Sequence, residues 1–178
     1  MKHNKIILIS GGARSGKSLA AEKMVCSSGS KPFYIATCPV IDGEMSERVQ
    51  RHQQRREADN WQTIEEQLDL VKALEQARDK HADAVLIDCL TLWINNLLYH
   101  NPKLSEDALA EKAANLVKSM KTMPFLTVLV ISEVGLGLVP ESALARRFRD
   151  LSGRCAQIIA AAADEVYFSV AGIQQRIK

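Results

Sequence analysis

The stretch "IILISGGARSGKS", residues 6–18, decides the fold of this chain. Its first five residues are typical of a short buried strand, and "GGARSGKS" (11–18) then matches the pattern G-x-x-x-x-G-K-[ST] without a mismatch. The glycines let the backbone turn tightly, so that successive N–H groups and the start of a helix converge on phosphate oxygens. Lys17 can reach the outer phosphates, and the Ser18 hydroxyl can bind magnesium. A chance match in a glycine-rich turn is the alternative, but the position between strand and helix favours a phosphate-binding loop (P-loop).

Further short apolar runs follow the first one along the chain. They are continuously apolar and do not alternate with polar residues, which is typical of strands that are covered on both faces. Patterns of helical length separate them, so the order predicts an α/β domain with a mostly parallel sheet. The expected strands are 6–10, 33–37, 84–88, 127–132 and 165–172.

The segments between these runs predict helices over 17–26, 44–57, 63–79, 105–121 and 141–164. In the third, apolar residues recur every three or four positions, as on one face of a helix. The fourth begins with Ser105, a good N-cap residue. The last is one helix, or two that are broken near Gly153. Since no repeat or linker interrupts the pattern, we expect one domain over residues 1–178.

Composition excludes several classes of protein. Of 178 residues, 47% are hydrophobic and 25% charged, which is ordinary for a soluble globular protein. A net charge of +2 is too small to indicate a nucleic-acid or membrane partner, and no apolar run approaches the roughly 20 residues of a membrane span. The four cysteines form no C-x-x-C pair and have no histidine at zinc-ligand spacing, which predicts free thiols in a reducing cytoplasm.

Asp88 closes the predicted strand 84–88, where an acidic residue helps to hold magnesium in P-loop folds. A strand-end or N-cap aspartate is the alternative. The P-loop itself leaves three classes open: a small-molecule kinase or nucleotidyltransferase, a GTPase switch, and an ATP-driven binding module. No N-K-x-D motif occurs, and the only D-x-x-G lies at 150–153 in a basic helical stretch. An enzyme that acts on a small molecule fits best.

The stretch "RVQRHQQRR" (48–56) places one histidine among four arginines. On a helix, Arg48 and Arg56 lie one turn either side of His52, and Arg55 lies three residues on. Such a cationic cluster keeps the imidazole neutral and gathers phosphate oxygens against it, which suits attack by a ring nitrogen on phosphorus. The spacing alone leaves open a solvated or phosphate-binding histidine without a covalent role.

Taken together, the motifs resemble those of the bifunctional adenosylcobinamide kinase / adenosylcobinamide-phosphate guanylyltransferases of cobalamin biosynthesis. The arginine-flanked histidine followed by W-x-T-x-E, and the segment E-V-G-x-G-x-V-P, are the most specific. The resemblance covers nearly the whole chain, through "GGARSGKS" (11–18), "YIAT" (34–37), "MSERVQRHQQRR" (45–56), W-x-T-x-E (61–65), "SEVGLGLVPE" (132–141), "ARRFRDLSGRCAQIIAAAADEVY" (145–167) and "AGI" (171–173).

The resemblance implies two reactions. The hydroxyl of adenosylcobinamide first takes the γ-phosphoryl group of ATP or GTP. A histidine then attacks the α-phosphorus of GTP, expels pyrophosphate and passes GMP to the new phosphate, which gives adenosylcobinamide-GDP. The family's R-[IV]-x-x-H element falls on residues 48–52, which makes His52 the nucleophile. The resemblance also implies a homotrimer. We therefore expect a P-loop NTPase-like α/β fold of the RecA-like type, with a mostly parallel central sheet flanked by helices.

Carried over residue by residue, the resemblance assigns catalysis to His52 and Lys17, and Mg²⁺ binding to Ser18 and Asp88. This chain departs from the family where Glu57 replaces a usual proline, where Gln53 replaces a frequent basic residue, and in the length of the segment from Arg56 to Trp61. The alternatives are a single-function small-metabolite kinase, in which the histidine only binds phosphate, and a GTP-binding regulatory module. The implied nucleotide contacts are Gly11, Gly12, Ala13, Arg14, Ser15, Gly16, Lys17, Ser18, Ala36, Thr37, Cys38, Gln53, Gln54, Arg55, Arg56, Glu65 and Asp88.

Overall fold

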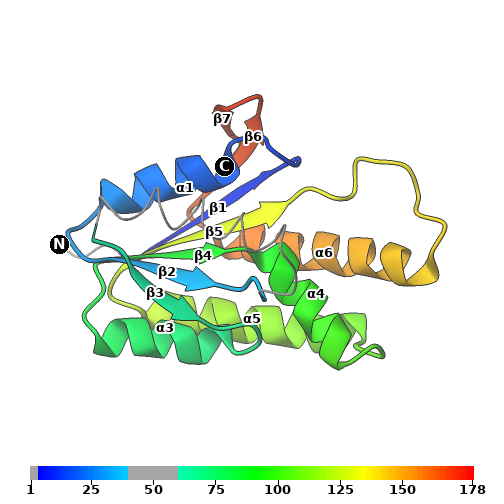
Figure 1. Cartoon of the computed structure of the whole chain (residues 1–178), viewed down its shortest axis with the longest axis horizontal. Helices are drawn as coiled ribbons and strands as arrows, with labels where there is room; N and C mark the ends of the chain where they lie inside the picture. The colour runs from blue at the N-terminus through cyan, green and yellow to red at the C-terminus, as the bar shows by residue number, and fades with distance from the viewer. Residues whose placement is uncertain (1–3, 40–59) are drawn as a thin grey trace.

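A computed structural model describes residues 4–39 and 60–178 of the chain, and its centre is a seven-stranded sheet in the order β3-β2-β4-β5-β1-β6-β7 (Figure 1). All neighbouring strands pair in parallel except β6 and β7. The strands are β1 (Lys5–Gly11), β2 (Pro32–Ala36), β3 (Gln62–Glu65), β4 (Ala84–Asp88), β5 (Leu126–Ser132), β6 (Glu165–Val170) and β7 (Ile173–Arg176). The helices are α1 (Lys17–Cys26), α3 (Leu70–Asp79), α4 (Leu90–His100), α5 (Glu106–Thr122) and α6 (Ala143–Ala162). The predicted α/β class with a mostly parallel sheet is confirmed.

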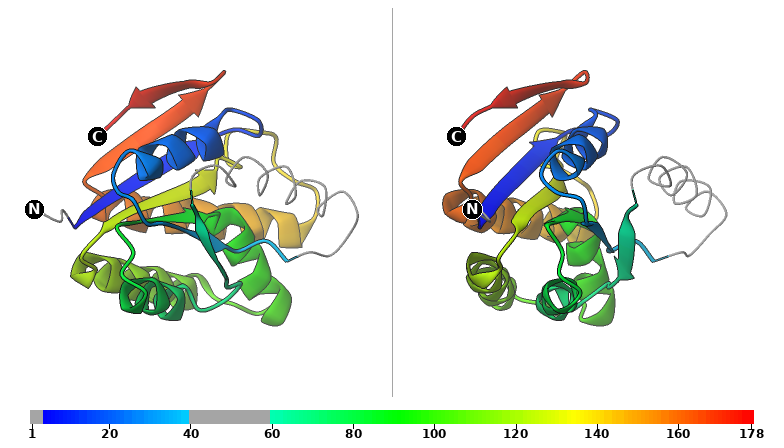
Figure 2. Two further views of the ribbon diagram at one scale, coloured as in Figure 1. Left: turned by 60° about the vertical axis from the view of Figure 1, so that its left-hand side comes forward. Right: turned by 90° about the vertical axis from the view of Figure 1, so that its left-hand side faces the viewer.

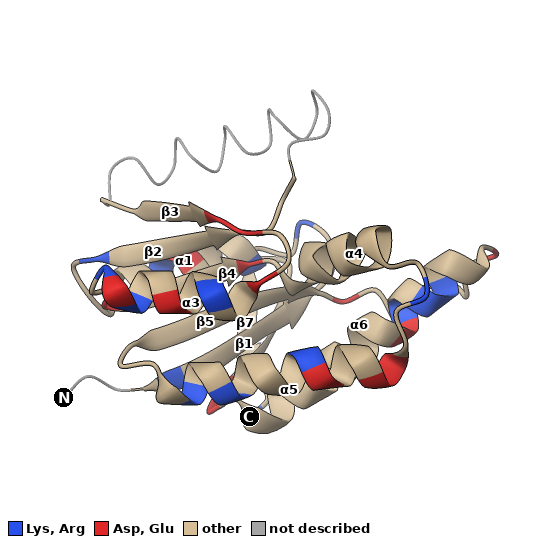
Figure 3. Cartoon of the chain, turned by 90° about the horizontal axis from the view of Figure 1, so that it is seen from below, with Lys and Arg blue, Asp and Glu red and all other residues tan. Residues whose placement is uncertain are grey.

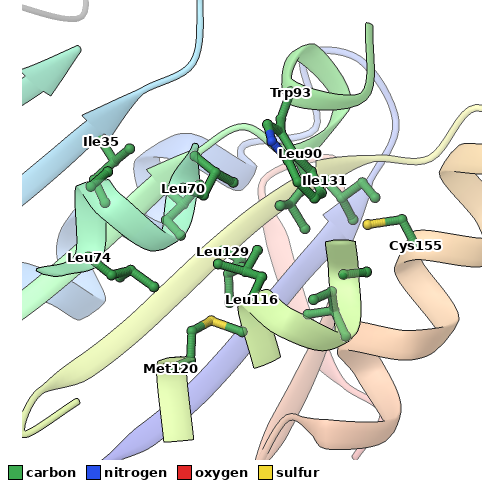
Figure 4. Packing of buried hydrophobic residues seen from close by; sticks show 14 of the residues in the cluster. Ile35, Leu70, Leu74, Leu90, Trp93, Leu116, Met120, Leu129, Ile131 and Cys155 are labelled. Atoms are coloured by element: carbon green, nitrogen blue, oxygen red, sulfur yellow. The ribbon is translucent and has the colours of Figure 1, made fainter. Parts of the chain in front are cut away.

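Two apolar cores, one on each face of the sheet, explain why the strands read as continuously apolar. Along β1, Ile7 and Ile9 pack in the core beneath α1, whereas Ile6 and Leu8 pack in the core shared with α3, α4, α5 and α6. Successive side chains of a strand point to opposite faces, so both sets must be apolar. Figure 2 shows α1 on one side of the sheet and the other helices opposite it, and Figure 4 shows the larger core.

The predicted helix over 63–79 is wrong in its first half. Residues Gln62–Glu65 form strand β3, and helix α3 begins only at Leu70, after Asp69 accepts a hydrogen bond from the Lys72 amide at 3.0 Å. Ile64 does face the same core as α3, but it reaches that core from a strand paired with β2. Because Ile64 of β3 and the apolar face of α3 contribute to one core, their spacing along the sequence resembles that of a single helix.

Two elements were not predicted at all. Helix α4 follows β4 directly, and its apolar residues at positions 90, 93, 94 and 97 have a helical spacing that could have revealed it. Strand β7 is only four residues long and mostly exposed, so it has no apolar pattern to detect. The last helix, left open as one or two, is continuous past Gly153. The predicted helix 44–57, which carries His52, lies outside the described residues.

Charged side chains of both signs are mixed along α3, α5 and the first turns of α6 (Figure 3). Within residues 4–39 and 60–178, every helix is too short or too polar to cross a membrane.

Gly153 offers a test of the continuous α6. It is exposed in the middle of the helix, and an added Cβ would meet no atom within 4 Å. Because glycine in a helix interior costs about 0.5–1 kcal/mol relative to alanine, Gly153→Ala should raise the free energy of unfolding by that amount. Urea denaturation followed by circular dichroism measures it.

Gly172→Ala is the matched control, because Gly172 also has open space around it but has a φ of +84°. Alanine there is strained and should lower the stability. A Gly153→Ala variant that is less stable than wild type would contradict an unbroken α6.

Candidate active site

The P-loop joins the end of β1 to the start of α1, and two of its glycines are required by geometry. Gly11 has a φ of +151°, and a Cβ there would collide with the Ser169 carbonyl oxygen. Gly16 has a φ of +96° and would place a Cβ 3.1 Å from the Cα of Gly172. Gly16 is also the N-cap residue of α1, and no described side chain caps that helix. The unpaired N–H groups of its first turn are therefore available to an anion.

Lys17 lies buried in the first turn of α1 with its charged end folded over the loop. Its Nζ donates to the Gly12 carbonyl oxygen at 2.5 Å and lies 3.5 Å from the Ser15 Oγ. Burial lowers the pKa of Lys17, and the nearby Cys89 and Asp88 act in the opposite direction. The ammonium group is thus held at the loop, within electrostatic reach of the carboxylate at the end of β4.

Parallel pairing brings the other predicted residues to the same edge of the sheet. Ala36, at the end of β2, is paired with Glu65 of β3 on one side and with Asp88 of β4 on the other. Strand β5 separates β4 from β1, which carries the P-loop. Ligands of open parallel sheets bind at the carboxyl ends of the strands. Four strands therefore deliver predicted site residues to one edge (Figure 1).

Thr37 holds the turn that presents Asp88. It is fully buried, and its hydroxyl accepts a hydrogen bond from the Cys89 amide at 2.7 Å and donates to the Cys89 carbonyl oxygen at 2.8 Å. The Asn96 amide group of α4 donates to the Thr37 carbonyl oxygen at 2.8 Å. Burial raises the pKa of the Cys89 thiol to about 12, and the Asp88 charge acts in the same direction. In this structure the Thr37 hydroxyl therefore positions the β4–α4 junction.

The β6–β7 hairpin supports the P-loop through hydrogen bonds that the sequence alone does not reveal. We call these hydrogen bonds the brace. The Ser15 carbonyl oxygen accepts hydrogen bonds from the Ser169 hydroxyl at 2.7 Å and from the Gly172 amide at 2.9 Å. Gln174 donates from its side-chain amide to the Ser169 hydroxyl at 2.9 Å. In a trans peptide the C=O and the following N–H point in opposite directions. Binding of the Ser15 carbonyl by the hairpin therefore turns the Gly16 N–H away from it, toward the open side of the loop.

The remaining predicted residues differ in their surroundings. Ala13, Arg14 and Glu65 are exposed, and Gly12 and Ser18 are half-buried. Cys38 contacts the Pro39 carbonyl oxygen through its sulfur at 3.6 Å. The predicted nucleotide contacts that the structure describes thus lie along one edge of the sheet, from β3 to the P-loop after β1. His52, Gln53, Gln54, Arg55 and Arg56 lie outside the described residues.

Ser18 and Asp88 have the chemistry that a magnesium site needs. Both are half-buried, and no hydrogen bond from another described residue occupies the Ser18 hydroxyl or the Asp88 carboxylate. Hydroxyl and carboxylate oxygens are the ligands that Mg²⁺ prefers, usually together with water and phosphate oxygens. The residues present therefore fit this ion.

Comparison with known protein families shows to which family this chain belongs. The family model described as cobinamide kinase / cobinamide phosphate guanyltransferase matches residues 7–177. This chain belongs to that family. The bifunctional adenosylcobalamin biosynthesis protein CobU of Salmonella typhimurium is 42% identical over 187 residues, which covers 97% of this chain and 99% of that protein. The Escherichia coli CobU protein is 39% identical at the same coverage, and the CobP protein of Pseudomonas aeruginosa is 42% identical with 96% of both chains covered. The resemblance inferred from the motifs is confirmed.

The solved structures add evidence on the fold alone. A KaiC-like protein from Pyrococcus horikoshii superposes with a TM-score of 0.57 at 13% sequence identity, covering 93% of this chain and 70% of that one. This match confirms the expected P-loop NTPase-like, RecA-like fold. At so low an identity it carries no information about substrates.

Loss of the Ser169 hydroxyl should weaken nucleotide binding. Ser169→Ala removes one of the two hydrogen bonds that orient the Ser15 carbonyl. Since a buried hydrogen bond contributes about 0.5–1.5 kcal/mol, we expect the Kd for ATP or GTP to rise about three- to tenfold. Isothermal titration calorimetry with each nucleotide measures the change.

Ser152→Ala is the control, because Ser152 is equally buried and donates to the Phe148 carbonyl oxygen of α6, outside the P-loop. It should change stability without changing nucleotide affinity. If both variants bound nucleotide like wild type, the hairpin would be only a structural neighbour of the loop.

Proposed function

We propose that this chain catalyses two successive reactions on one substrate: phosphorylation of adenosylcobinamide, then transfer of GMP to the resulting phosphate. The observation that carries the proposal is a complete P-loop at the carboxyl edge of the sheet in a chain that belongs to the cobinamide kinase / cobinamide phosphate guanyltransferase family over residues 7–177. The product, adenosylcobinamide-GDP, is an intermediate of cobalamin biosynthesis. ATP and GTP are the nucleotide substrates.

The kinase step needs positioning and charge stabilisation, not an enzyme nucleophile. The substrate hydroxyl attacks the γ-phosphorus in line, the bond to the bridging oxygen breaks, and the hydroxyl proton leaves. The open N–H groups at the start of α1 hold the phosphate oxygens, and the Lys17 ammonium offsets the charge on the outer phosphates. When nucleotide binds, these oxygens replace the Gly12 carbonyl as the partner of Lys17.

Magnesium would be held by Ser18 and Asp88 at the end of the loop. Bound there, the ion would supply positive charge that offsets the charge of the phosphates. The hydrogen bonds between the Thr37 hydroxyl and the Cys89 backbone fix the chain directly after Asp88.

The guanylyl transfer proceeds through His52. A neutral imidazole nitrogen forms a bond to the α-phosphorus of GTP while the bond to the pyrophosphate oxygen breaks. An oxygen of the cobinamide phosphate then attacks the same phosphorus, and the electron pair of the P–N bond returns to the ring. The surrounding arginines, including Arg55 and Arg56, bind the phosphate oxygens and keep the imidazole unprotonated. Support comes from the R-[IV]-x-x-H match at residues 48–52 and from family membership.

The proposal includes the setting of the enzyme. The chain forms a single catalytic domain over residues 1–178, assembles as a homotrimer and works in the cytoplasm. The nucleotide contacts beyond the P-loop are Ala36, Thr37, Cys38, Gln53, Gln54, Arg55, Arg56, Glu65 and Asp88.

Asp88→Asn tests the magnesium site, because it keeps the shape of the side chain and removes the charge. The magnesium concentration for half-maximal kinase rate should rise at least about tenfold. Glu66→Gln is the control: Glu66 lies at the same edge, but its carboxylate accepts from the Leu68 and Asp69 amides. An unchanged magnesium dependence in Asp88→Asn would leave Asp88 as a structural strand-end residue.

His52→Ala tests the covalent step. Label from GTP carrying ³²P at the α-phosphorus should no longer stay on the protein, and adenosylcobinamide-GDP should not form. Phosphorylation of adenosylcobinamide should persist, because the substrate hydroxyl attacks directly. In the wild-type protein, mild acid should release the label as GMP and neutral hydroxylamine should not, as expected of a phosphoramidate.

His100→Ala is the control, since His100 is an exposed residue at the end of α4 and should not affect labelling. Acid-labile label that persists in His52→Ala would place the GMP on another residue. If wild-type protein phosphorylated the substrate but never carried label, a single-function kinase would be the better description.

A further inference from the structure

The loop between β5 and α6 exposes an unusual concentration of apolar side chains. Leu136 is 81% exposed, Leu138 96% and Val139 65%, and Leu144 in the first turn of α6 is 59% exposed. These four are among only nine large hydrophobic residues that are exposed in the described part of the chain. We call residues 134–140 together with Leu144 the apolar loop. Its residues 134–140 carry no charge, as Figure 3 also shows.

The apolar loop leaves the sheet directly beside the P-loop. Ser132, the last residue of β5, is paired with Gly11, and the Glu133 amide donates to the Gly11 carbonyl oxygen at 2.9 Å. From there the loop extends beyond the carboxyl edge of the sheet (Figure 1). A molecule that lies on the start of this loop is therefore next to the P-loop.

Local hydrogen bonds hold the backbone at both ends of the apolar loop. At the first end Glu133 accepts a hydrogen bond from the Gly135 amide at 2.6 Å. At the second end Arg146 donates to the carbonyl oxygens of Pro140 and Glu141 at 2.9 and 2.7 Å. Between them, Gly137 has no atom within 4 Å of an added Cβ, so nothing in the described chain covers the middle of the loop.

Two hollows of the described structure lie away from the P-loop. One is bordered by residues at the starts of strands, including Asn4, Asp83 and Asp164, at the edge opposite the P-loop. Another lies between α3, α4 and α5 and is lined by Leu70, Trp93 and other core residues. Neither borders the P-loop, so neither can hold an acceptor whose hydroxyl must reach the γ-phosphate.

We propose that the apolar loop binds the corrin ring of the cobinamide substrate. This inference rests on the proposed function. The corrin is a wide ring whose faces and edge are rich in methyl and methylene groups, with amide side chains around it. Leu136, Leu138 and Val139 contact that hydrocarbon surface, and the exposed backbone groups of the glycine-rich segment bond to its amides. The substrate hydroxyl lies on a flexible arm of the ring and extends from the loop to the nucleotide.

A second copy of this chain is the other occupant to consider, and the size of the surface argues against it. Stable interfaces bury about 800 Å² on each partner from roughly 20–30 residues. The apolar loop offers four exposed apolar side chains on one short segment. That is too little for a subunit interface by itself, but it suits one face of a single macrocycle.

The double variant Leu136→Ser with Leu138→Ser tests the proposal. We expect the KM for adenosylcobinamide in the kinase reaction to rise at least about tenfold, while the KM for ATP stays unchanged. Direct binding of cobinamide to the nucleotide-free protein, followed by equilibrium dialysis and corrin absorbance, should weaken by the same factor. The melting temperature should not fall, because both side chains are exposed.

Ile177→Ser is the matched control, since Ile177 is 63% exposed and lies beside Val166 near the opposite edge of the sheet. It should leave both KM values and cobinamide binding as in wild type. The conservative variant Leu138→Met should retain near-normal binding.

Three outcomes would overturn the proposal: cobinamide binding and KM within about twofold of wild type in the double variant, an equal loss in Ile177→Ser, or a change of oligomeric state in light scattering without a change in cobinamide binding. The last would assign the apolar loop to contacts between copies. Failure of the proposed function is distinct, because wild-type protein would then neither bind nor phosphorylate cobinamide.

Discussion

Parallel pairing of β1 with β5 on one side and β6 on the other is the constraint on which the candidate site depends. Its register aligns Gly11 with both Ser132 and Ser169. The strand that enters the P-loop therefore has the start of the apolar loop on one side and the β6–β7 hairpin on the other. A one-residue slip of β1 would exchange its two apolar faces and would take Gly11 out of register with Ser132 and Ser169.

The parts of the candidate site lie on different elements, and each part is held by its own set of hydrogen bonds. The P-loop is shaped by its glycines and by the hairpin, Asp88 is placed by the turn that Thr37 and Asn96 hold, and the proposed corrin surface is anchored by Glu133 and Arg146. These supports lie in different parts of the chain. Changes to the acceptor surface can therefore leave the nucleotide site intact.

Much of the fold could be predicted because its causes are local. The P-loop motif requires a strand before it and a helix after it, and the buried strands are continuous apolar runs. The boundary at 63–79 could not be predicted, because Ile64 and the face of α3 share one core and so imitate a single helix.

The brace could not be predicted either. Ser169 and Gln174 are ordinary polar residues in sequence. Ser169 bonds to a loop more than 150 positions away, and Gln174 donates to the Ser169 hydroxyl. The short segment "AGI" belongs to the family resemblance, and the structure gives it a physical reason: Ala171 and Gly172 both have positive φ in the turn that contacts the P-loop.

The long separation between Ser15 and Ser169 has a consequence for synthesis of the protein. The P-loop is made almost first, whereas the hairpin that orients its Ser15 carbonyl is made almost last. Contacts so distant in sequence form late, since the intervening chain must be ordered before they close. A nascent chain therefore carries the complete nucleotide motif before the hairpin can orient the Ser15 carbonyl, and nucleotide should bind more weakly until the last strands have joined the sheet.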